Sequence, residues 1–468
     1  MRKIELQPTA ENVLKTFLDD SIGRNTDIAY FISLIESLDE CNSIALNSPW
    51  GSGKTFFVKQ VKMILEVYNQ FLESEFNEDE VAKVCHCYKS LCSKIGISEI
   101  EKPYLPIYYD AWKYDNDDDP VLSLVFEIIS TLDNEGDFSD VNIDYIEILK
   151  AFADTFNIKG IYSLIKSIES DDNLKNIIKT RNLKRKVDEF LDKIPTERAD
   201  KIIVFIDELD RCKPTYAVKV LERIKHYFNN DKILFVFSTN LEELQSSVKC
   251  VYGENFNAYR YLDRFFDLKT PLPEPDMQKY LSSIDFQNTR YIFDEICTEI
   301  ISRYNFQLRD ISKYVRYVKM TSYHFAHNSS GHGFSEDIGY EFCLHCLTPI
   351  LIGLLIHDIN MYNNFIAGKD NSPLIELLGN GEIGKYYFKE LLSNGERYDG
   401  EPSAEYTLVT HKNKLEELYA ALFNVNYNGS RFGKTIGNIT IEQGTKKYLL
   451  SIINLLSKQA QVIRNMEE

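Results

Sequence analysis

Basic residues are the minority charge in this sequence, and a long hydrophobic run is missing. The chain of 468 residues has 53 lysines and arginines against 71 aspartates and glutamates, which gives a formal net charge of −18. This balance argues against a protein that binds nucleic acid over its whole surface, because phosphate neutralisation needs a basic face. The most apolar run, residues 342–356, contains His345 and Pro349. It falls short of the ~20 apolar residues that a membrane span needs.

A secretory signal is also missing, because the N-terminus shows no charged segment followed by an apolar one. We therefore expect a cytoplasmic protein without a membrane partner. The nine cysteines never form the paired spacing of a structural zinc site. The stretches 85–92 and 343–346, which combine cysteine with histidine, come nearest to it. We interpret these cysteines as free thiols in a reducing compartment.

The most informative stretch starts with the apolar residues 44–46, passes through a loop with two glycines and enters a segment with helical spacing, which we expect to run as a helix to about Phe76. This order predicts a strand, a phosphate-binding loop and a helix, because backbone N–H groups at a helix start hold an anion. Lys54 would reach the β- and γ-phosphates, and the Thr55 hydroxyl would bind Mg²⁺. The predicted nucleotide-binding residues are Ser48, Pro49, Trp50, Gly51, Ser52, Gly53, Lys54, Thr55 and Phe56.

This loop departs from the usual pattern G-x-x-x-x-G-K-[ST], because Ser48 stands where the first glycine is expected. A second stretch, residues 428–435, also ends in Gly-Lys-Thr and also lacks the first glycine. It has no predicted strand before it and no predicted helix after it. We therefore interpret it as a surface turn.

A buried strand is predicted for residues 202–206, which are all apolar and mostly β-branched. Such a run is typical of a strand covered on both faces of a parallel sheet. It ends in two adjacent carboxylates, Asp207 and Glu208. We assign Asp207 to the Mg²⁺ shell and Glu208 to activation of the attacking water. The alternative is a strand that simply ends in solubilising acids.

Two more strands are predicted, at residues 104–109 and 233–237. The first leads into an aromatic segment, and such strand ends lie where ligands bind in open α/β sheets. Within that segment we expect Trp112 to pack as an anchor beneath the site. The second strand leads to Asn240, which is placed to hold the attacking water or the γ-phosphate. Asn240 is also suited to cap the following helix, and the two roles are compatible.

Three arginines are candidates for stabilising the transferring phosphoryl group. Arg260 and Arg264 precede a predicted edge strand, and a neighbouring subunit can supply such an arginine. Arg309 lies in a helix-start context and would reach back to the nucleotide from a lid. The alternatives are a surface salt bridge for the first two and a solvated helix position for Arg309.

The length allows two or three domains. We predict a nucleotide-binding domain over residues 1–275, with a charged helical insert at 116–200. A helical lid would follow at 276–334, and a helical module without a catalytic motif would occupy 335–468. The insert contains the basic cluster 181–186, which is either a solvated face or a contact for a partner or nucleic acid.

Taken together, four stretches resemble the KAP-family P-loop NTPases, within the larger AAA+/STAND-like group. Residues 49–55 resemble the family's W-G-x-G-K-[ST] loop, and residues 207–212 resemble its D-[DE]-L-D-R-C strand end. Residues 261–265 resemble its tyrosine-led segment, and residues 110–114 its aromatic segment at the second strand. The resemblance covers roughly residues 1–330.

The resemblance implies a three-layer α/β/α fold with a parallel sheet in the order 5-1-4-3-2. It also implies that Asp207 is the Walker B metal residue and that a sensor arginine, placed here at Arg309, lies on a helical lid. Many members carry membrane helices between the phosphate loop and the Walker B strand. The insert here is charged, which argues against a membrane role. Bacterial relatives often serve in defence against phage or other mobile elements.

These motifs predict a Mg²⁺-dependent nucleoside triphosphatase, with ATP as the favoured substrate. Nucleotide state would control homo-oligomerisation or recruitment of a protein effector. The alternative is a regulatory scaffold that binds ATP and hydrolyses it slowly or not at all, which Ser48 and the long C-terminal module favour. A nucleic-acid motor is a third hypothesis, and it depends on the basic cluster 181–186 alone.

Overall fold

The computed structural model describes most of the chain on both sides of the predicted insert. The described residues are 6–38, 43–72, 74–117, 120–134, 199–228, 231–286, 292–323, 339, 342–379, 404–424, 434–437, 439–442 and 444–454. They divide into two compact units, a first unit over residues 6–283 and a second unit from residue 284 onward. The basic cluster 181–186 and most of the predicted insert lie outside the described residues. The predicted domain boundaries at 275 and 334 stay predictions.

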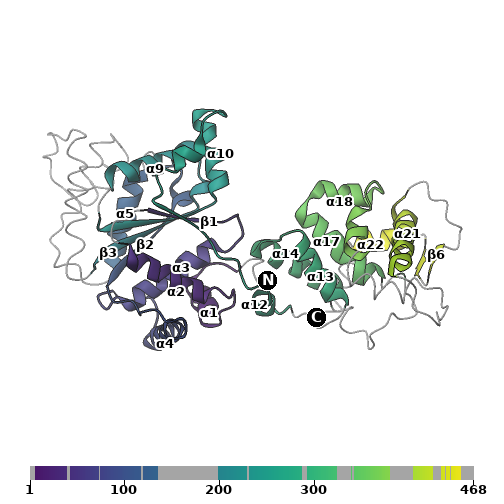
Figure 1. Ribbon diagram of the computed structural model, residues 1–468, viewed down its shortest axis with the longest axis horizontal. Helices are drawn as coiled ribbons and strands as arrows, with labels where there is room; N and C mark the ends of the chain where they lie inside the picture. The colour runs from purple at the N-terminus through teal and green to yellow at the C-terminus, as the bar shows by residue number, and fades with distance from the viewer. Residues whose placement is uncertain are drawn as a thin grey trace, which may run out of the picture. The chain divides into compact units, whose positions relative to one another are not determined.

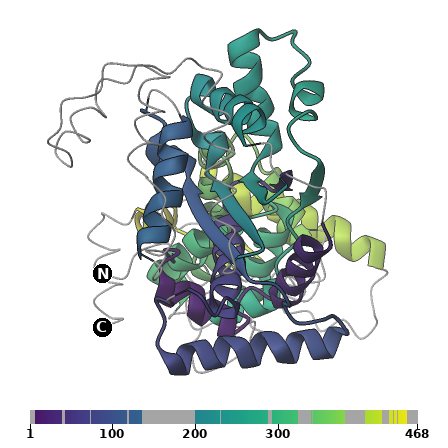
Figure 2. The same cartoon turned by 90° about the vertical axis from the view of Figure 1, so that its left-hand side faces the viewer.

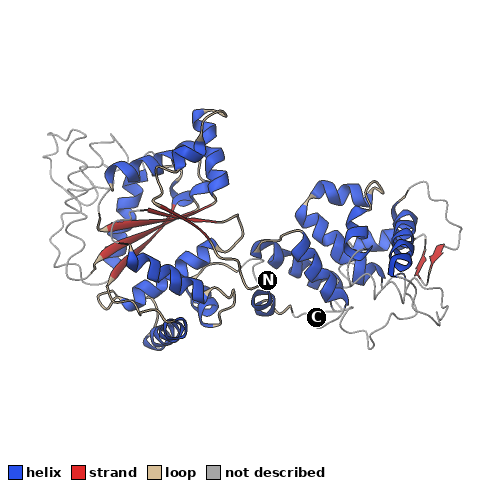
Figure 3. Cartoon of the chain, viewed as in Figure 1, coloured by secondary structure: helices blue, strands red, loops and turns tan. Residues whose placement is uncertain are grey.

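A five-stranded parallel sheet forms the centre of the first unit (Figure 3). Its strand order is β2-β3-β4-β1-β5, which is the expected 5-1-4-3-2 read from the other edge. The fold class expected from the sequence is therefore confirmed. The strands are β1 (Ser43–Asn47), β2 (Tyr104–Asp110), β3 (Lys201–Asp207), β4 (Ile233–Thr239) and β5 (Leu268–Pro271).

The register of the sheet brings polar side chains together at one edge. Asp110 pairs with Asp207 in the β2–β3 ladder, and Asp207 pairs with Ser238 in the β3–β4 ladder. Asn47 at the end of β1 pairs with Thr239 at the end of β4. Because all these strands run parallel, their carboxyl ends meet on one side, where ligands bind in open sheets of this kind.

Helices cover both faces of the sheet and bury a separate hydrophobic core on each (Figure 1). One layer contains α1 (Ala10–Leu18), α2 (Asn25–Ser37), α3 (Lys54–Tyr68) and α4 (Glu78–Ile95), with α4 as the lowest helix in Figure 2. The other contains α5 (Pro120–Asn134), α9 (Pro214–Tyr227), α10 (Leu241–Tyr252) and α11 (Ala258–Leu262). Short helical turns η1 (Ala111–Tyr114) and η2 (Leu209–Arg211) follow β2 and β3, and α12 (Met277–Ser283) ends the unit.

The expected end of the helix after the phosphate loop was wrong. The helix after Thr55 was expected to continue to about Phe76, but α3 ends at Tyr68. Asn69 follows it, and its side-chain amide donates to the carbonyl of Tyr104 (2.8 Å), which fixes the chain where it leaves the helix. The charged stretch 77–101 contains α4, which no pattern indicated.

The helix α4 escaped recognition because its buried face is narrow, consisting of Val84, Tyr88 and Cys92. Its ends nevertheless carry local signals. Asn77 and Glu80 form a capping box at its start, and Gly96 ends it in the left-handed conformation. Capping chemistry was therefore the better guide here than hydrophobic periodicity.

The second unit is mainly helical. Its main helices are α13 (Ile292–Arg303), α14 (Leu308–Val318), α17 (Thr348–His357), α18 (Ile359–Ile366), α21 (Ala404–Phe423) and α22 (Thr445–Ile453). Shorter helical segments are η3 (Lys319–Tyr323), η4 (Cys343–Leu347), α19 (Ser372–Leu374) and η5 (Ile375–Gly379). In the part of the chain that the structure describes, no helix combines the length and the apolar character needed to cross a bilayer.

An antiparallel hairpin, formed by β6 (Lys434–Ile436) and β7 (Ile439–Ile441), interrupts this helical unit. It contains the end of the second Gly-Lys-Thr sequence, which was interpreted as a surface turn. Lys434 and Thr435 instead begin a strand, and the Thr435 hydroxyl contacts that of Thr440 across the ladder (3.1 Å). β-Branched side chains favour such cross-strand pairs, and no helix start follows that would bind a phosphate.

Gly23 lies where two segments of the first unit approach closely. Its φ angle is +74°, and a Cβ added there would lie 2.3 Å from the Cβ of Asp276. Beside it, the backbone N–H of Asp276 donates to the carbonyl of Ile22 (2.9 Å). Lys279 also pairs with Asp20 across the same junction (2.5 Å). This junction holds the segment that begins α12 against the loop between α1 and α2.

We expect Gly23→Ala to lower the free energy of unfolding of the first unit by about 2 kcal/mol or more. A left-handed conformation costs an alanine about 1–2 kcal/mol, and the contact with Asp276 adds to that cost. Gly96→Ala is the matched control, because Gly96 has the same φ of +74° and nothing within 4 Å of an added Cβ. Thermal unfolding of both variants measures the difference, and equal losses would contradict the close approach at Gly23.

Candidate nucleotide site

The loop between β1 and α3 has the backbone of an anion cradle. Gly51 and Gly53 have φ angles of +79° and +91°, in the left-handed region that side chains disfavour. The Ser52 hydroxyl donates to the carbonyl of Pro49 across the loop (2.8 Å). The backbone N–H of Ser48 donates to the carbonyl of Thr239, which joins the loop to β4 (3.2 Å). The first N–H groups of α3 have no partner within the helix, and the positive end of the helix dipole adds to their field.

Lys54 is the first residue of α3, and its side chain folds over the loop. Its ammonium group is buried and donates to the carbonyls of Ser48 (2.6 Å) and Pro49 (3.0 Å). Burial lowers the pKa of Lys54, and the nearby charges of Asp210, Asp207 and Glu208 oppose that shift. The ammonium group is thus held inside the loop, where an entering phosphate would replace the carbonyls as its partner.

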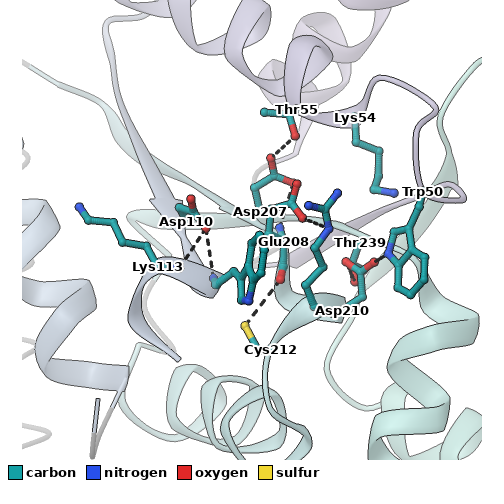
Figure 4. Close-up of polar contacts among 12 residues, drawn as sticks. Trp50, Lys54, Thr55, Asp110, Lys113, Asp207, Glu208, Asp210, Cys212 and Thr239 are labelled. Atoms are coloured by element: carbon teal, nitrogen blue, oxygen red, sulfur yellow. Dashed lines mark hydrogen bonds and ion pairs between the residues drawn. The ribbon is translucent and has the colours of Figure 1, made fainter. Parts of the chain in front are cut away.

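Asp207 at the end of β3 is almost wholly buried, and three donors surround its carboxylate. The Thr55 hydroxyl donates to Oδ2 (2.7 Å), and so does the Tyr108 hydroxyl (2.9 Å). The backbone N–H of Glu208 donates to Oδ1 (3.0 Å). Figure 4 shows Thr55 above Asp207, on the helix that follows the phosphate loop. The structure therefore brings together the two residues predicted to bind Mg²⁺.

Tyr108 was missed by sequence reasoning, although it lies on β2 two residues before the strand ends. Alternate residues of a strand share one face, so Tyr108 and Asp110 face the same way. Burial and the charge of Asp207 raise the pKa of the Tyr108 hydroxyl, which stays a donor at neutral pH. The ammonium group of Lys59 lies 4.6 Å from the centre of its ring. The sequence signal that could have identified Tyr108 is a tyrosine, which has a polar hydroxyl, close to the end of a buried strand.

Glu208 follows Asp207 in an unusual backbone conformation, with a φ angle of +60°. Its carboxylate forms an ion pair with the guanidinium of Arg211, three residues later. Burial and the charge of Asp207 raise the pKa of Glu208 to about 7, and Arg211 opposes the shift. Such left-handed positions in non-glycine residues concentrate at functional sites. The thiol of Cys212 donates to the backbone carbonyl of Glu208 and supports this turn (3.6 Å).

Trp112 was expected to pack as a buried anchor, and this was wrong, because its side chain is 52% exposed. Asp110 accepts hydrogen bonds from the backbone N–H groups of Trp112 (3.1 Å) and Lys113 (3.2 Å). This cap starts the short helix η1, which turns the chain outward at the strand end. The guanidinium of Arg211 lies 5.6 Å from the centre of the Trp112 ring, so Trp112 supports the partner of Glu208.

Among the described residues, Asn240 and the two arginines of the first unit, Arg260 and Arg264, make no hydrogen bond or ion pair with this cluster. Asn240 caps α10 by accepting a hydrogen bond from the N–H of Glu242 (3.1 Å), as its position predicted. Arg260 and Arg264 are exposed on α11 and just after it. Arg309 is exposed on α14 of the second unit. Catalytic roles for Asn240, Arg264 and Arg309 stay predictions.

Arg24 is a second residue of the site that the sequence did not single out for this role. It is buried ahead of α2, and its Nη1 donates to the carbonyl of Ser52 in the phosphate loop (2.8 Å). Burial lowers its pKa to about 10, so the guanidinium stays charged at neutral pH. Arg24 directly precedes α2, so the start of that helix is joined to the phosphate loop.

The chain belongs to the KAP family of P-loop domains. A family model described as "KAP family P-loop domain" matches residues 27–323, which is more than half of the chain. The match includes the phosphate loop, Asp207 and Glu208 described above. No curated protein sequence matches the chain. The family and the geometry together define a P-loop nucleoside triphosphatase domain.

The oxygen atoms at Asp207 fit a magnesium ion. Magnesium prefers oxygen ligands and is usually held by one or two protein groups together with water and phosphate oxygens. Thr55, in the first turn of α3, supplies a hydroxyl, and Asp207, at the end of β3, supplies a carboxylate. The two oxygen atoms lie 2.7 Å apart. Among the described residues, no three His, Cys, Asp or Glu side chains converge to form a metal site of the all-protein kind. The described cysteines of residues 85–92 and 343–346 are free thiols.

Proposed function

We propose that this protein is a Mg²⁺-dependent ATPase. The observation that carries the proposal is the placement of Thr55 against Asp207, with Lys54 next to Thr55 in the chain and Glu208 next to Asp207. Thr55 and Asp207 would hold the ion, which would neutralise charge on the β- and γ-phosphates. Lys54 is the cation of the loop, and Glu208 is the adjacent carboxylate that is free of the Thr55–Asp207 contact.

In the proposed hydrolysis, one set of residues binds the phosphates and Glu208 accepts the proton. The loop amides and Lys54 bind and orient the phosphates, and their charges stabilise negative charge that shifts within the γ-phosphoryl group. Glu208 accepts a proton from the attacking water, which then bonds to the γ-phosphorus as the bond to the β-phosphate oxygen breaks. The products are ADP, inorganic phosphate and a proton.

Nucleotide state would then control the assembly of the protein, through copies of the chain or an effector protein. Two features support this part of the proposal. Arg260 and Arg264 are exposed on the first unit, and Arg309 is exposed in the first turn of a helix of the second unit. Because bacterial relatives in this family often serve in defence, we propose a role in bacterial defence against phage or mobile elements. Size measurements with ATP, with ADP and without nucleotide test the assembly step.

A regulatory scaffold with slow or no hydrolysis is the second candidate. The ion pair between Glu208 and Arg211 favours it, because a carboxylate held by a guanidinium is a weaker base. Phosphate release from the unchanged chain, with Mg²⁺ and with a chelator, separates the candidates. Mg²⁺-dependent release supports the ATPase. A change of size on ATP binding without phosphate release supports the scaffold.

Tyr108→Phe should raise the Mg²⁺ concentration needed for half-maximal ATP binding or hydrolysis about tenfold. The reason is that the Tyr108 hydroxyl fixes the oxygen of Asp207 that faces Thr55, and groups behind a metal ligand typically matter by this factor. Mg²⁺ titration at saturating ATP measures the effect.

Tyr109→Phe provides the control for this prediction. The Tyr109 hydroxyl lies on the opposite face of β2 and contacts Ser123 (2.8 Å) and Tyr216 (2.7 Å) instead. Removing it should lower stability but leave the Mg²⁺ requirement unchanged. Equal Mg²⁺ requirements for both variants and the unchanged chain would contradict the role given to Tyr108.

A further inference from the structure

Asp210 joins three separate segments of the nucleotide site, although the proposed mechanism assigns it no role. It lies in η2, directly after β3, and its side chain is buried, with 7% of its surface exposed. One carboxylate oxygen accepts a hydrogen bond from the indole N–H of Trp50 in the phosphate loop. The other accepts from the hydroxyl of Thr239 at the end of β4 (3.1 Å). Figure 4 shows Asp210 between these two side chains.

Trp50 gains little from burial, because 45% of its surface is exposed. Its indole has a single donor, and that donor is used on Asp210. Trp50 is followed by Gly51 in the left-handed conformation, so this part of the loop is conformationally demanding. The contact with Asp210 therefore fixes the front of the loop, while Arg24 fixes Ser52 farther along.

Thr239 connects Asp210 to the start of the phosphate loop. Its side chain is fully buried, and its backbone carbonyl accepts from the N–H of Ser48, the first residue of the loop. The Asp210 carboxylate is thus tied to both ends of the segment from Ser48 to Trp50. Only Leu209 separates Asp210 from Glu208, so the direction of the Glu208 side chain depends on where Asp210 is held.

We propose that Asp210 is a positioning residue for hydrolysis, which couples the shape of the phosphate loop to the placement of Glu208. This inference rests on the proposed ATPase function and deepens it. Movement of Trp50 as phosphate enters the loop is passed through Asp210 to the turn that holds Glu208. The clamp is defined as Trp50, Asp210 and Thr239.

The test compares three variants of the full chain, each of which breaks the clamp at a different place. Asp210→Ala removes both hydrogen bonds, Trp50→Phe removes only the bond to the loop, and Thr239→Val removes only the bond to β4. Each should lower kcat about tenfold, with KM for ATP changed less than about threefold, because binding groups stay and placement of the base is lost. Trp50→Phe and Thr239→Val keep the buried carboxylate, so the test does not depend on Asp210→Ala folding.

Asp263→Ala is the matched control, because it removes an exposed aspartate that pairs with Lys269 and with no member of the clamp. It should keep kcat within about twofold, as surface ion pairs contribute little. The double variant Asp210→Ala with Trp50→Phe should be no slower than Asp210→Ala alone, since both changes remove the same bond. Multiplied losses in the double variant would overturn the clamp, and so would unchanged kcat in all three single variants.

A spectroscopic measurement follows the clamp directly. The chain has two tryptophans, so Trp112→Phe leaves Trp50 as the single indole. In that background, ATP with Mg²⁺ should shift the emission of Trp50, and Asp210→Ala should abolish the shift. An equal shift in both proteins would overturn the inference. If the unchanged chain turns over and the clamp variants match it, only the inference fails. If the unchanged chain releases no phosphate, the proposed ATPase itself fails.

Discussion

A Lys54→Ala chain should bind ATP roughly 100-fold more weakly than the unchanged chain and should show no Mg²⁺-dependent phosphate release. The Lys54 ammonium is buried inside the loop and is held there by two backbone carbonyls. A phosphate oxygen would take the place of those carbonyls, and a charged hydrogen bond of this kind contributes about 1.5–3 kcal/mol. Because the Lys54 ammonium is buried, the upper end of that range applies, and removing it corresponds to a loss of roughly 100-fold in affinity. Equilibrium binding of a fluorescent ATP analogue measures the loss.

The chain supplies its own control for this substitution. Lys434 also stands in a Gly-Lys-Thr sequence, but it lies in β6 and pairs with Glu417. Lys434→Ala should therefore leave ATP affinity and phosphate release unchanged. The assignment of the phosphate loop would be wrong if Lys434→Ala weakened binding as much as Lys54→Ala, or if Lys54→Ala bound ATP normally.

Glu208→Gln should lower kcat by about 10²–10⁴, the usual contribution of a general base, while ATP binding is retained. The glutamine keeps the size of the side chain and loses its capacity to accept a proton from water. Phosphate release at saturating ATP, together with binding of the analogue, separates the two effects. The variant should accumulate bound ATP, and any nucleotide-dependent assembly should become longer lived.

Glu254→Gln makes the same chemical change at an exposed position after α10 and should have no effect on the rate. Equal steady-state rates for Glu208→Gln and the unchanged chain would remove Glu208 as the group that activates water. The observed ion pair with Arg211 would then be its structural role.

The individual strands of the sheet were predictable because their signals are local, whereas the strand order was an implication of the resemblance to the KAP family. The strands β3 and β4 each contain an unbroken run of five apolar residues, and a parallel sheet buries such runs on both faces. The loop from Ser48 to Gly53 contains two glycines and is followed by a helical pattern. This order predicted a phosphate loop between β1 and α3. Thr55 and Asp207 were predicted to share one site, and the structure brings their side chains together, while their role in binding Mg²⁺ stays a prediction.

The remaining parts of the site depend on contacts between residues far apart in the sequence. Tyr108 contacts Asp207 from a neighbouring strand, Arg24 contacts Ser52 from the segment before β1, and Trp50 contacts Asp210 across the sheet edge. No periodicity or spacing encodes such pairs, because they arise only when the strands are aligned. Trp112 was misplaced for a different reason, because a local cap by Asp110 turns the chain outward at this point.

The central claim is that the γ-phosphoryl group lies between the Lys54 ammonium and the carboxylates of Asp207 and Glu208. A crystal structure of the full chain with Mg²⁺ and a non-hydrolysable ATP analogue tests it most directly. We expect the γ-phosphate to contact Lys54, with the ion on Thr55 and Asp207 and Glu208 facing the γ-phosphorus. An analogue bound elsewhere, or a γ-phosphate remote from both acids, would contradict the account.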